Sequence, residues 1–403
     1  MHDQFSQRIT CRAPEAIRPS SLAVAGDSFG WGSAGLLAAV LDAISQRGNG
    51  HTRFLGLDTD TGRPVLRQHA VHNWADTSEL TGDELGNLLT RHSVEAAVVV
   101  LNAELAIRLE RVGCPVIYVD SIPFAWTENE RIPQTLSRYC AQLCPALPRP
   151  CWPVLRGITS LHWVGRVVGA RPLASTSCVP RKAVVNFGGL QSPVTTAASI
   201  DSYVRLVGIA ALTALKKHGY DRIVVTGDLD PDNLPISSDL AHGLNISGGR
   251  LPRQQFLDEL ATAEIVATSP GQMTLLEIGA LGRPAIVLPP QNLSHIMNAS
   301  EVTQIVDPNI VVPWPSGTVD QDRVLKERNR GEEWAISTMY RDMVATATMW
   351  PGGIPRLAEA CSNALFYAKG ENITLSSLCS FTGSNGAEEI VDILYDFLNS
   401  RGI

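Results

Sequence analysis

The sequence predicts an α/β protein built from two doubly wound, Rossmann-like domains. Three observations support this class. The chain has 403 residues, more than one ordinary hydrophobic core usually serves. Short apolar runs alternate with segments of helical periodicity in two series, which is typical of parallel sheets with crossover helices. Between the two series lies a broken stretch that begins with the proline-rich PALPRPCWPVLRG.

The first series predicts an N-terminal domain over residues 1–150. Its buried strands are short apolar runs, and helices follow the first and third of them. These strands are SLAVAG (21–26), RFLGLD (53–58), AAVVVLN (96–102) and PVIYVDS (115–121). Residues 151–180 are interpreted as the crossing between domains, although the strand-like LHWVGRVV lies inside this range.

The second series predicts a C-terminal domain over residues 181–370. Its strands are AVVNFGG (183–189), DRIVVTGD (221–228), LNISGG (244–249), EIVATSPG (264–271) and PAIVLPP (284–290). Helices are predicted over 202–219, ended by Gly219, and over 274–282. Residues 371–403 are predicted to be helical and able to pack back on the N-terminal domain.

Composition limits the function classes. Hydrophobic residues make up 44 % and charged residues 18 %, and the formal net charge of −7 offers no global attraction for nucleic acid or an anionic membrane. We see no run of about 18 apolar residues, so no membrane span is predicted. The polar N-terminus lacks an apolar signal region and indicates a cytoplasmic protein. The cysteine cluster Cys140, Cys144 and Cys151 has no histidine at zinc-site spacing, so no metal is predicted.

Two glycine-rich loops follow strands. The first, from Gly26 to Gly35, contains Asp27, Phe29, Gly30, Trp31, Gly32 and Ser33. The second, from Asn186 to Ser192, contains Gly188 and Gly189. Open α/β sheets bind ligands at the carboxyl ends of strands, where glycines let the backbone approach an anion. Each loop is also compatible with a tight structural turn, and the first lacks the dinucleotide-binding spacing.

The most specific signal is the run from Thr268 to Ala299. Ser269 and Gly271 precede a predicted helix, whose first amides are free to hold a negative charge. Glu277 lies three residues after Thr274, on the same helical face. A carboxylate there can accept two hydrogen bonds from a ribose diol. Free amides can bind the negative charge of a diphosphate, and a carboxylate beside them can bind the ribose diol. This combination suits a nucleoside diphosphate sugar.

This run, SPGQMTLLEIGALGRPAIVLPPQNLSHIMNA, resembles the donor-site signature of glycosyltransferases with the GT-B fold. It is most similar to the family of the peptidoglycan N-acetylglucosaminyltransferase that makes lipid II. The resemblance implies two domains that face a cleft, and transfer of a sugar from a nucleotide-diphosphate sugar such as a UDP-sugar. It implies that Glu277 contacts ribose and that Gly188 and Gly189 contact phosphate or sugar. It further places Ser269, Gly271, Gln272, Met273 and Thr274 at the diphosphate and base, and Gln291, Asn292 and His295 at the donor sugar.

Positive charge near the phosphates is expected from Arg253, Arg181 and Lys182. Arg253 follows Leu251-Pro252, in the segment where relatives place the base-binding loop. The run from Thr268 to Ala299 contains no Asp-x-Asp motif, consistent with metal independence. No cofactor is expected beyond the nucleotide sugar itself.

The N-terminal half departs from the family. Its first loop has no Gly-His or His-Val element, so the histidine base of many relatives is absent there. Transfer usually requires a group that takes the acceptor proton. Asp27 is the first candidate and Asp120 the second, although an aspartate after a strand commonly caps the next helix. His72 and His295 are lesser candidates.

The acceptor is open at this stage. The first loop, Phe29 to Ser33, is expected at the cleft, and the stretch Phe124-Ala125-Trp126 either lines an acceptor pocket or belongs to the core. No basic-apolar helix suggests a lipid, so a small-molecule acceptor, as in secondary metabolism, is favoured. The alternatives are a nucleotide-sugar hydrolase or epimerase on the same fold, and a non-catalytic regulator that binds a nucleotide sugar. A nicotinamide oxidoreductase is disfavoured by the spacing of the first loop.

Overall fold

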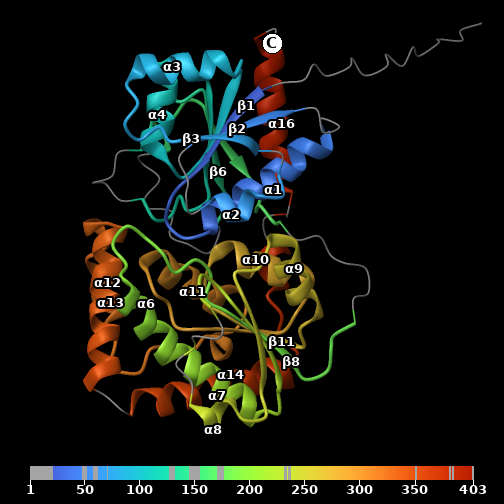
Figure 1. The fold of residues 1–403 in the computed structure, drawn as a ribbon, viewed down its shortest axis with the longest axis vertical. Coiled ribbons are helices and arrows are strands. Elements are labelled where there is room, and N and C mark those ends of the chain that lie inside the picture. Colours follow the sequence, from blue (N-terminus) through green and yellow to red (C-terminus); the bar gives the residue numbers. More distant parts are fainter. Residues whose placement is uncertain are drawn as a thin grey trace, which may run out of the picture.

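The computed structural model describes residues 21–47, 52–57, 62–69, 71–126, 132–144, 155–169, 177–230, 234, 237–349, 352–380, 383 and 385–401. These residues form two α/β domains, one above the other along the long axis of the molecule (Figure 1). Every strand pairing in the two sheets is parallel. The predicted fold class, two doubly wound domains, is therefore confirmed.

The N-terminal domain contains, among the described residues, a seven-stranded sheet with the order β3-β2-β1-β4-β5-β6-β7. Its strands are β1 (Ser21–Gly26), β2 (Arg53–Leu57), β3 (Val71–Ala75), β4 (Ala96–Val100), β5 (Val116–Asp120), β6 (Arg138–Gln142) and β7 (Leu161–Val164). Its helices are α1 (Gly32–Arg47), α2 (Arg63–Leu66), α3 (Gly82–Arg91) and α4 (Ala103–Arg111). The strand order reverses between β1 and β4, and a ligand crevice forms at such a point.

The C-terminal domain has a five-stranded sheet in the described part of the chain, with the order β10-β9-β8-β11-β12. Its strands are β8 (Lys182–Asn186), β9 (Arg222–Thr226), β10 (Asn245–Gly249), β11 (Ile265–Thr268) and β12 (Ala285–Val287). Its helices are α6 (Ala197–Tyr203), α7 (Ile209–Lys217), α8 (Ser238–Ala241), α9 (Arg253–Thr262), α10 (Gln272–Leu281), α11 (Leu293–Ile305), α12 (Gln321–Lys326), α13 (Glu332–Met349), α14 (Gly353–Gly370) and α15 (Ser376–Ser380). The reversal point lies between β8 and β11, so both reversal points carry a predicted glycine-rich loop or donor motif.

Two strands of the first sheet, β3 and β6, were not predicted, and β7 lies inside the range expected to be an interdomain crossing. β7 pairs with β6, from Tyr139 opposite Leu161 to Gln142 opposite Val164. The first sheet therefore continues to Val164, beyond the expected domain end at residue 150. The crossing from one sheet to the other is made by the chain between Val164 and Lys182.

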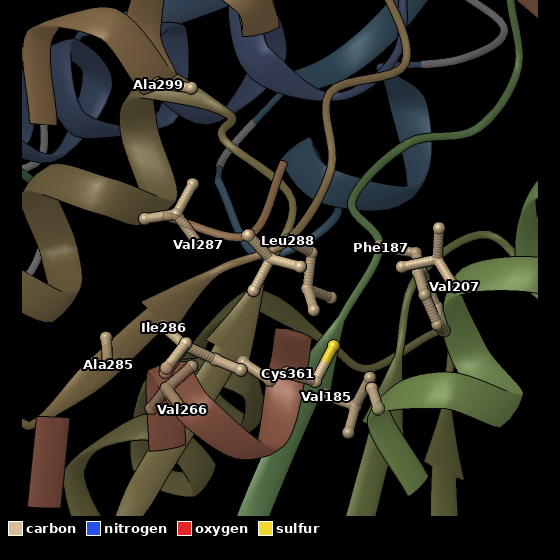
Figure 2. Packing of buried hydrophobic residues seen from close by; sticks show 14 of the residues in the cluster. Val185, Phe187, Val207, Val266, Ala285, Ile286, Val287, Leu288, Ala299 and Cys361 are labelled. Carbon is tan, nitrogen blue, oxygen red and sulfur yellow. The ribbon is translucent and has the colours of Figure 1, made fainter. Parts of the chain in front are cut away.

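The core of the C-terminal domain is formed by the strands and the helices on either side of them. Figure 2 shows Phe187 beside Val207, and Cys361 of α14 between Val185 and Ile286. The helical segment Ala197–Lys217, which includes a π-helical turn at Val204–Gly208, is long and apolar enough to cross a membrane. Its most apolar window is 61 % buried inside the protein, and it packs against α14, so it is a core helix here.

The last helix, α16 (Gly386–Ser400), returns to the N-terminal domain, where it lies beside α1 (Figure 1). Its apolar side chains Ile390, Val391 and Leu394 join the hydrophobic cluster under α1. Its first turn is fixed to the crossing segment, because the Gly386 N–H donates to the Arg166 carbonyl at 3.1 Å. The chain therefore passes between the two domains a second time.

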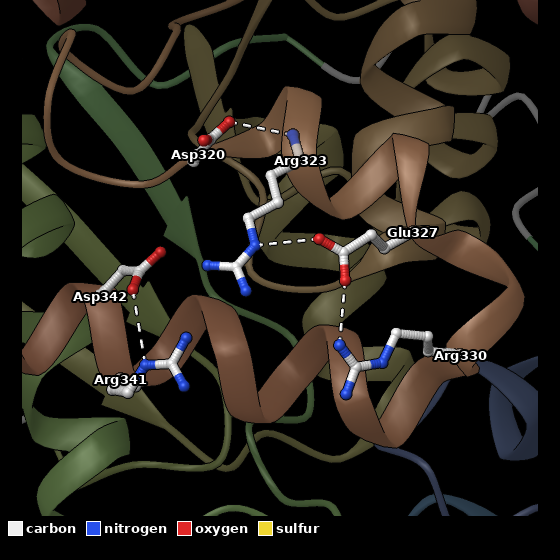
Figure 3. A network of polar contacts seen from close by, with 6 residues as sticks. All are labelled: Asp320, Arg323, Glu327, Arg330, Arg341 and Asp342. Atoms are coloured by element: carbon white, nitrogen blue, oxygen red, sulfur yellow. Dashed lines mark hydrogen bonds and ion pairs between the residues drawn. The ribbon is translucent and has the colours of Figure 1, made fainter.

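A surface network fastens the turn between α12 and α13 (Figure 3). Asp320 caps α12 by accepting a hydrogen bond from the Arg323 N–H at 2.9 Å. Glu327 then accepts hydrogen bonds from Arg323 at 3.1 Å and Arg330 at 2.9 Å. Such exposed pairs contribute little stability individually, but they fix the chain direction at the start of α13, which reaches the cleft.

Candidate functional site

A cavity of about 700 Å³ lies between the two domains. Its walls come from the loops after β1, β8 and β11, the chain before α9, the first turn of α11, and side chains of α13. The predicted donor and first-loop residues line this cavity, as do Asp27 and Arg253, whereas Asp120, Arg181 and Lys182 do not. The predicted residues that line it are Asp27, Phe29, Gly30, Trp31, Gly32, Ser33, Gly188, Gly189, Arg253, Ser269, Gly271, Gln272, Met273, Thr274, Glu277, Gln291, Asn292 and His295.

The two glycine-rich loops touch each other across the cleft. The Gly30 N–H donates to the Gln191 carbonyl at 3.0 Å. A Cβ added at Gly189 would lie 2.5 Å from the Trp31 nitrogen, so only glycine permits this approach. Gly30 and Gly188 have φ angles of 63° and 68°, which glycine adopts without strain. The loops therefore close one edge of the cavity.

The N-terminus of α10 points its amides into the cavity. Gly271 is the N-cap and supplies no side-chain cap. Ser269 does not replace it, because its hydroxyl and its N–H both donate to the Asn186 carbonyl, at 3.0 and 2.8 Å. The first amides of α10 are therefore left for a ligand, and the helix dipole favours a negative one.

Asn186 fixes the loop beneath these amides. Its side-chain amide donates to Thr268 at 3.0 Å. Oδ1 of the same side chain accepts from the Thr226 hydroxyl at 3.0 Å and from the Gly188 N–H at 3.1 Å. Three neighbouring strands, β8, β9 and β11, are thus tied together at their carboxyl ends, which fixes the relative positions of the loops that follow them.

Two of the predicted contacts on α10 are altered by packing. The side chain of Met273 packs into the hydrophobic cluster of the N-terminal domain, so only its amide can serve a ligand. Gln272 donates from its side chain to Cys144 at 3.8 Å, again toward the N-terminal domain. Thr274 lines the cavity one turn before Glu277, which places both on the face that the periodicity predicted.

Glu277 is 1 % exposed and forms an ion pair with Arg253, whose Nη2 lies 2.5 Å from Oε1. Arg253 therefore pairs with the predicted ribose carboxylate instead of standing free for the phosphates. Arg181 and Lys182, also expected near the phosphates, pair elsewhere: Arg181 with Asp221 at 2.7 Å and Lys182 with Glu259 at 2.5 Å. Neither lies among the cavity-lining residues of the described chain, so that expectation was wrong.

The first turn of α11 forms the opposite wall. The amide of Gln291 is engaged at both ends, because it donates to the Phe187 carbonyl at 3.2 Å and accepts from the Tyr340 hydroxyl at 2.7 Å. Asn292 caps α11 by accepting from the His295 N–H at 2.8 Å. Burial lowers the pKa of His295 to about 3, so its ring is neutral at ordinary pH.

Two buried polar atoms on this wall have no hydrogen-bond partner among the described residues: Nδ1 of His295 and Oδ1 of Asn298. They lie three residues apart, on one face of α11, and both residues line the cavity. Asn298 was not among the predicted contacts, although it belongs to the Asn-Ala pair of the motif. Buried polar atoms normally find a partner, so this face is suited to a hydroxyl-rich ligand.

Asp27 occupies the position expected for a general base. It follows β1 directly and lines the cavity. Burial raises the pKa of its carboxyl to about 6, partly offset by the hydrogen bond that its Oδ1 accepts from the Ser28 N–H at 2.8 Å. Ser33 supports the loop, since its hydroxyl donates to the Asp27 carbonyl. A carboxyl with a pKa near 6 is basic enough to take a proton at neutral pH.

Asp120 is fully buried and does not reach the cavity, which corrects its place among the candidate bases. Its Oδ2 accepts from the Trp126 indole at 2.5 Å and from the Tyr139 hydroxyl at 2.6 Å. Its Oδ1 accepts from the Ile122 N–H at 3.0 Å. Asp120 therefore holds Trp126 in place, and Trp126 is the residue that faces the cavity.

The N-terminal wall is largely apolar. Trp31, Trp126 and Ala125 line it, whereas Phe124 is buried in a core cluster. Two further segments that line the cavity were not predicted from the sequence. The first is α2 with the residues after it, which contributes Pro64, Val65, Arg67 and Gln68. The second is α13, which contributes Glu332, Ile336 and Tyr340. These segments carry no motif, and only the fold brings them to the cleft.

No group of three His, Cys, Asp or Glu residues within the described ranges is placed to hold a metal ion. Burial raises the pKa of both Cys140 and Cys144 to about 12, so these thiols stay protonated. Cys151 lies outside the described residues, as does the side chain of His72.

The matches of this chain among known proteins are structural and not sequence matches. No protein-family model matches the sequence, and no curated protein matches it. Among solved structures, a UDP-glucosyltransferase from Polygonum tinctorium is similar, with 13 % identity, 94 % of this chain and 99 % of that chain covered, and a TM-score of 0.52. MnaA of S. aureus, solved with UDP, has 10 % identity, coverages of 94 % and 97 %, and a TM-score of 0.52.

The spinosyn rhamnosyltransferase SpnG, solved with thymidine diphosphate, is similar over 93 % of this chain and 100 % of its own, with 13 % identity and a TM-score of 0.50. MurG of Acinetobacter baumannii also matches, at 11 % identity and a TM-score of 0.49, and the comparisons do not set it apart from the others. Similarity over nearly the whole of both chains shows that this protein has the fold of GT-B glycosyltransferases, as the donor-site resemblance implied.

Proposed function

We propose that this protein is a glycosyltransferase that moves a sugar from a nucleoside diphosphate sugar to a small-molecule acceptor. One observation carries the proposal: a single cavity combines the uncapped N-terminus of α10, the carboxylate of Glu277 and the carboxyl of Asp27. The three groups match the diphosphate, the ribose and the acceptor proton. Two neighbours of the same fold, solved with UDP and with thymidine diphosphate, support this class of ligand.

The reaction divides between the two walls. On the C-terminal wall, the first amides of α10 stabilise the diphosphate as negative charge develops on it during departure. The polar face of α11, with His295 and Asn298, meets the hydroxyls of the sugar. On the N-terminal wall, Asp27 accepts the proton of the acceptor hydroxyl as its oxygen attacks the anomeric carbon.

The acceptor wall favours an apolar compound of moderate size. Trp31 and Trp126 offer flat surfaces, and the Trp126 ring is fixed by its hydrogen bond to Asp120. Flat aromatic walls suit planar or aliphatic-ring acceptors better than heavily hydrated ones. We therefore propose a hydroxylated secondary metabolite as the acceptor. We also propose that the reaction takes place in the cytoplasm.

A thermal-shift screen with UDP, thymidine diphosphate, GDP and ADP tests the donor half. A selective rise in melting temperature with one nucleoside diphosphate supports the proposal, and no rise with any of them contradicts it. The matching nucleotide sugar is then incubated with a panel of hydroxylated aromatic acceptors, and products are followed by mass spectrometry. Release of free sugar without an acceptor would instead identify a hydrolase, and binding without turnover would identify a regulator.

A further inference from the structure

We propose that Arg253 is a positioning residue for the nucleoside end of the donor, which neutralises and orients the carboxylate of Glu277 instead of contacting the phosphates. The inference rests on the proposed function, because it concerns how the ribose is held. It changes the role predicted for Arg253 from the sequence, and it assigns a role to Gly169, which no motif contains.

The ion pair is buried and specific. Nη2 of Arg253 donates to Oε1 of Glu277 at 2.5 Å, and the two side chains are 9 % and 1 % exposed. A carboxylate removed from water needs a cation beside it, since an unpaired buried charge is strongly unfavourable. Arg253 supplies that charge through one oxygen of Glu277. The other oxygen, Oε2, is left to accept hydrogen bonds from a ribose diol.

A glycine of the crossing segment makes room for the guanidinium, and a glycine of α1 lies against it. A Cβ built on Gly169, in the crossing segment, would overlap Nη2 of Arg253 and would lie 3.1 Å from Oε1 of Glu277. A Cβ built on Gly35, in α1 of the N-terminal domain, would lie 3.6 Å from Nη1. The guanidinium is therefore enclosed by α9, α10, the crossing segment and α1.

This enclosure has a functional consequence. Arg253 is the first residue of α9, yet its head group touches segments of both domains. Glu277 is held in one orientation only while the domains are packed together around that head group. The position of the ribose carboxylate thus depends on Arg253 and on Gly169, and both are needed for discrimination at the ribose.

The test measures binding of UDP and of thymidine diphosphate, each against its 3′-deoxy analogue, by titration calorimetry. The wild type is expected to prefer the 3′-hydroxyl by about tenfold, as for a hydrogen bond to a charged group. Arg253→Met removes the charge, and Gly169→Ala keeps it but displaces the guanidinium. Both variants are expected to lose most of this preference, whereas Arg253→Lys retains part of it.

Two control variants separate this role from general destabilisation. Arg166→Met breaks a second buried ion pair of the described chain, that of Arg166 with Glu301, which lies off the cavity. Gly370→Ala adds a methyl group in open space. Both are expected to keep the wild-type preference, even if Arg166→Met lowers the melting temperature.

If Arg253→Met and Gly169→Ala both discriminate as the wild type does, the inference is overturned while the proposed function stands. A loss of preference that appears equally in Arg166→Met also overturns it, because the effect is then one of stability. If the wild type binds none of the four nucleoside diphosphates of the thermal-shift screen, the proposed function itself fails. Because Gly169→Ala only pushes aside the flexible end of a side chain, it is expected to fold even if Arg253→Met does not.

Discussion

Replacing Asp27 by asparagine is expected to make the protein more stable and nearly inactive. Burial raises the pKa of this carboxyl from 3.8 to about 6. The folded state therefore binds the proton more tightly than the unfolded chain does. The resulting contribution to the free energy of unfolding is fully present below the unfolded pKa of 3.8, and it is lost as the pH rises through about 6. At pH 8 the ionised carboxyl costs about 3 kcal/mol, and at pH 4.5 about 1 kcal/mol.

Asparagine carries no charge and can still accept the hydrogen bond from the Ser28 N–H. The free energy of unfolding of Asp27→Asn should thus exceed that of the wild type by about 3 kcal/mol at pH 8 and about 1 kcal/mol at pH 4.5. Guanidinium titrations at both pH values measure this difference. Asp201→Asn, a change at an exposed carboxylate, is the control and should show neither gain.

The same variant should lower kcat by about 10²- to 10⁴-fold, as expected for loss of a general base. For the wild type, kcat/KM should fall tenfold per pH unit below about 6, because protonated Asp27 cannot take the acceptor proton. A variant that keeps kcat within threefold of the wild type, or a stability gain that does not change with pH, would refute the role given to Asp27.

Three further outcomes follow from the site. Glu277→Gln should raise the donor KM about tenfold with a smaller change in kcat, measured by initial rates, and an unchanged KM would exclude Glu277 from the donor site. Asp120→Asn should lower the free energy of unfolding by about 1–3 kcal/mol in a denaturant titration, because the amide nitrogen cannot accept the hydrogen bonds that the carboxylate oxygen accepts. An unaltered midpoint would count against the hydrogen bonds from Trp126 and Tyr139. Gly189→Ala should separate the two glycine-rich loops, because the added Cβ meets the backbone of Trp31. A larger radius of gyration in small-angle scattering should accompany a higher KM, and an unchanged radius would show that the loops adjust.

The apolar strands were the part of the fold that the sequence predicted most directly. Strands such as AAVVV and AIV are buried on both faces, so continuous runs of small and branched residues identify them directly. β3 (VHNWA) and β6 (RYCAQ) were missed because each mixes polar and apolar residues over five positions. Such strands exist because a neighbouring strand pairs with them, and that pairing is a tertiary property.

The donor motif shows how much of a site lies in local sequence. The helix start at Gln272, the N-cap at Gly271 and the placing of Glu277 on the face of Thr274 all follow from spacing along one helix. Spacing did not show that Met273 turns its side chain into the N-terminal core. That contact depends on how two domains meet, which no local pattern encodes.

The sequence by itself determined the parallel architecture and the loops that end its strands, because strand periodicity and helix caps are local properties of the chain. Only the tertiary structure decided what charged side chains do. It buried Asp120 behind Trp126, gave Asp27 a pKa of about 6, and paired Arg253 with Glu277. Burial and pairing depend on residues far apart in the chain, and they control the free energy of a charge.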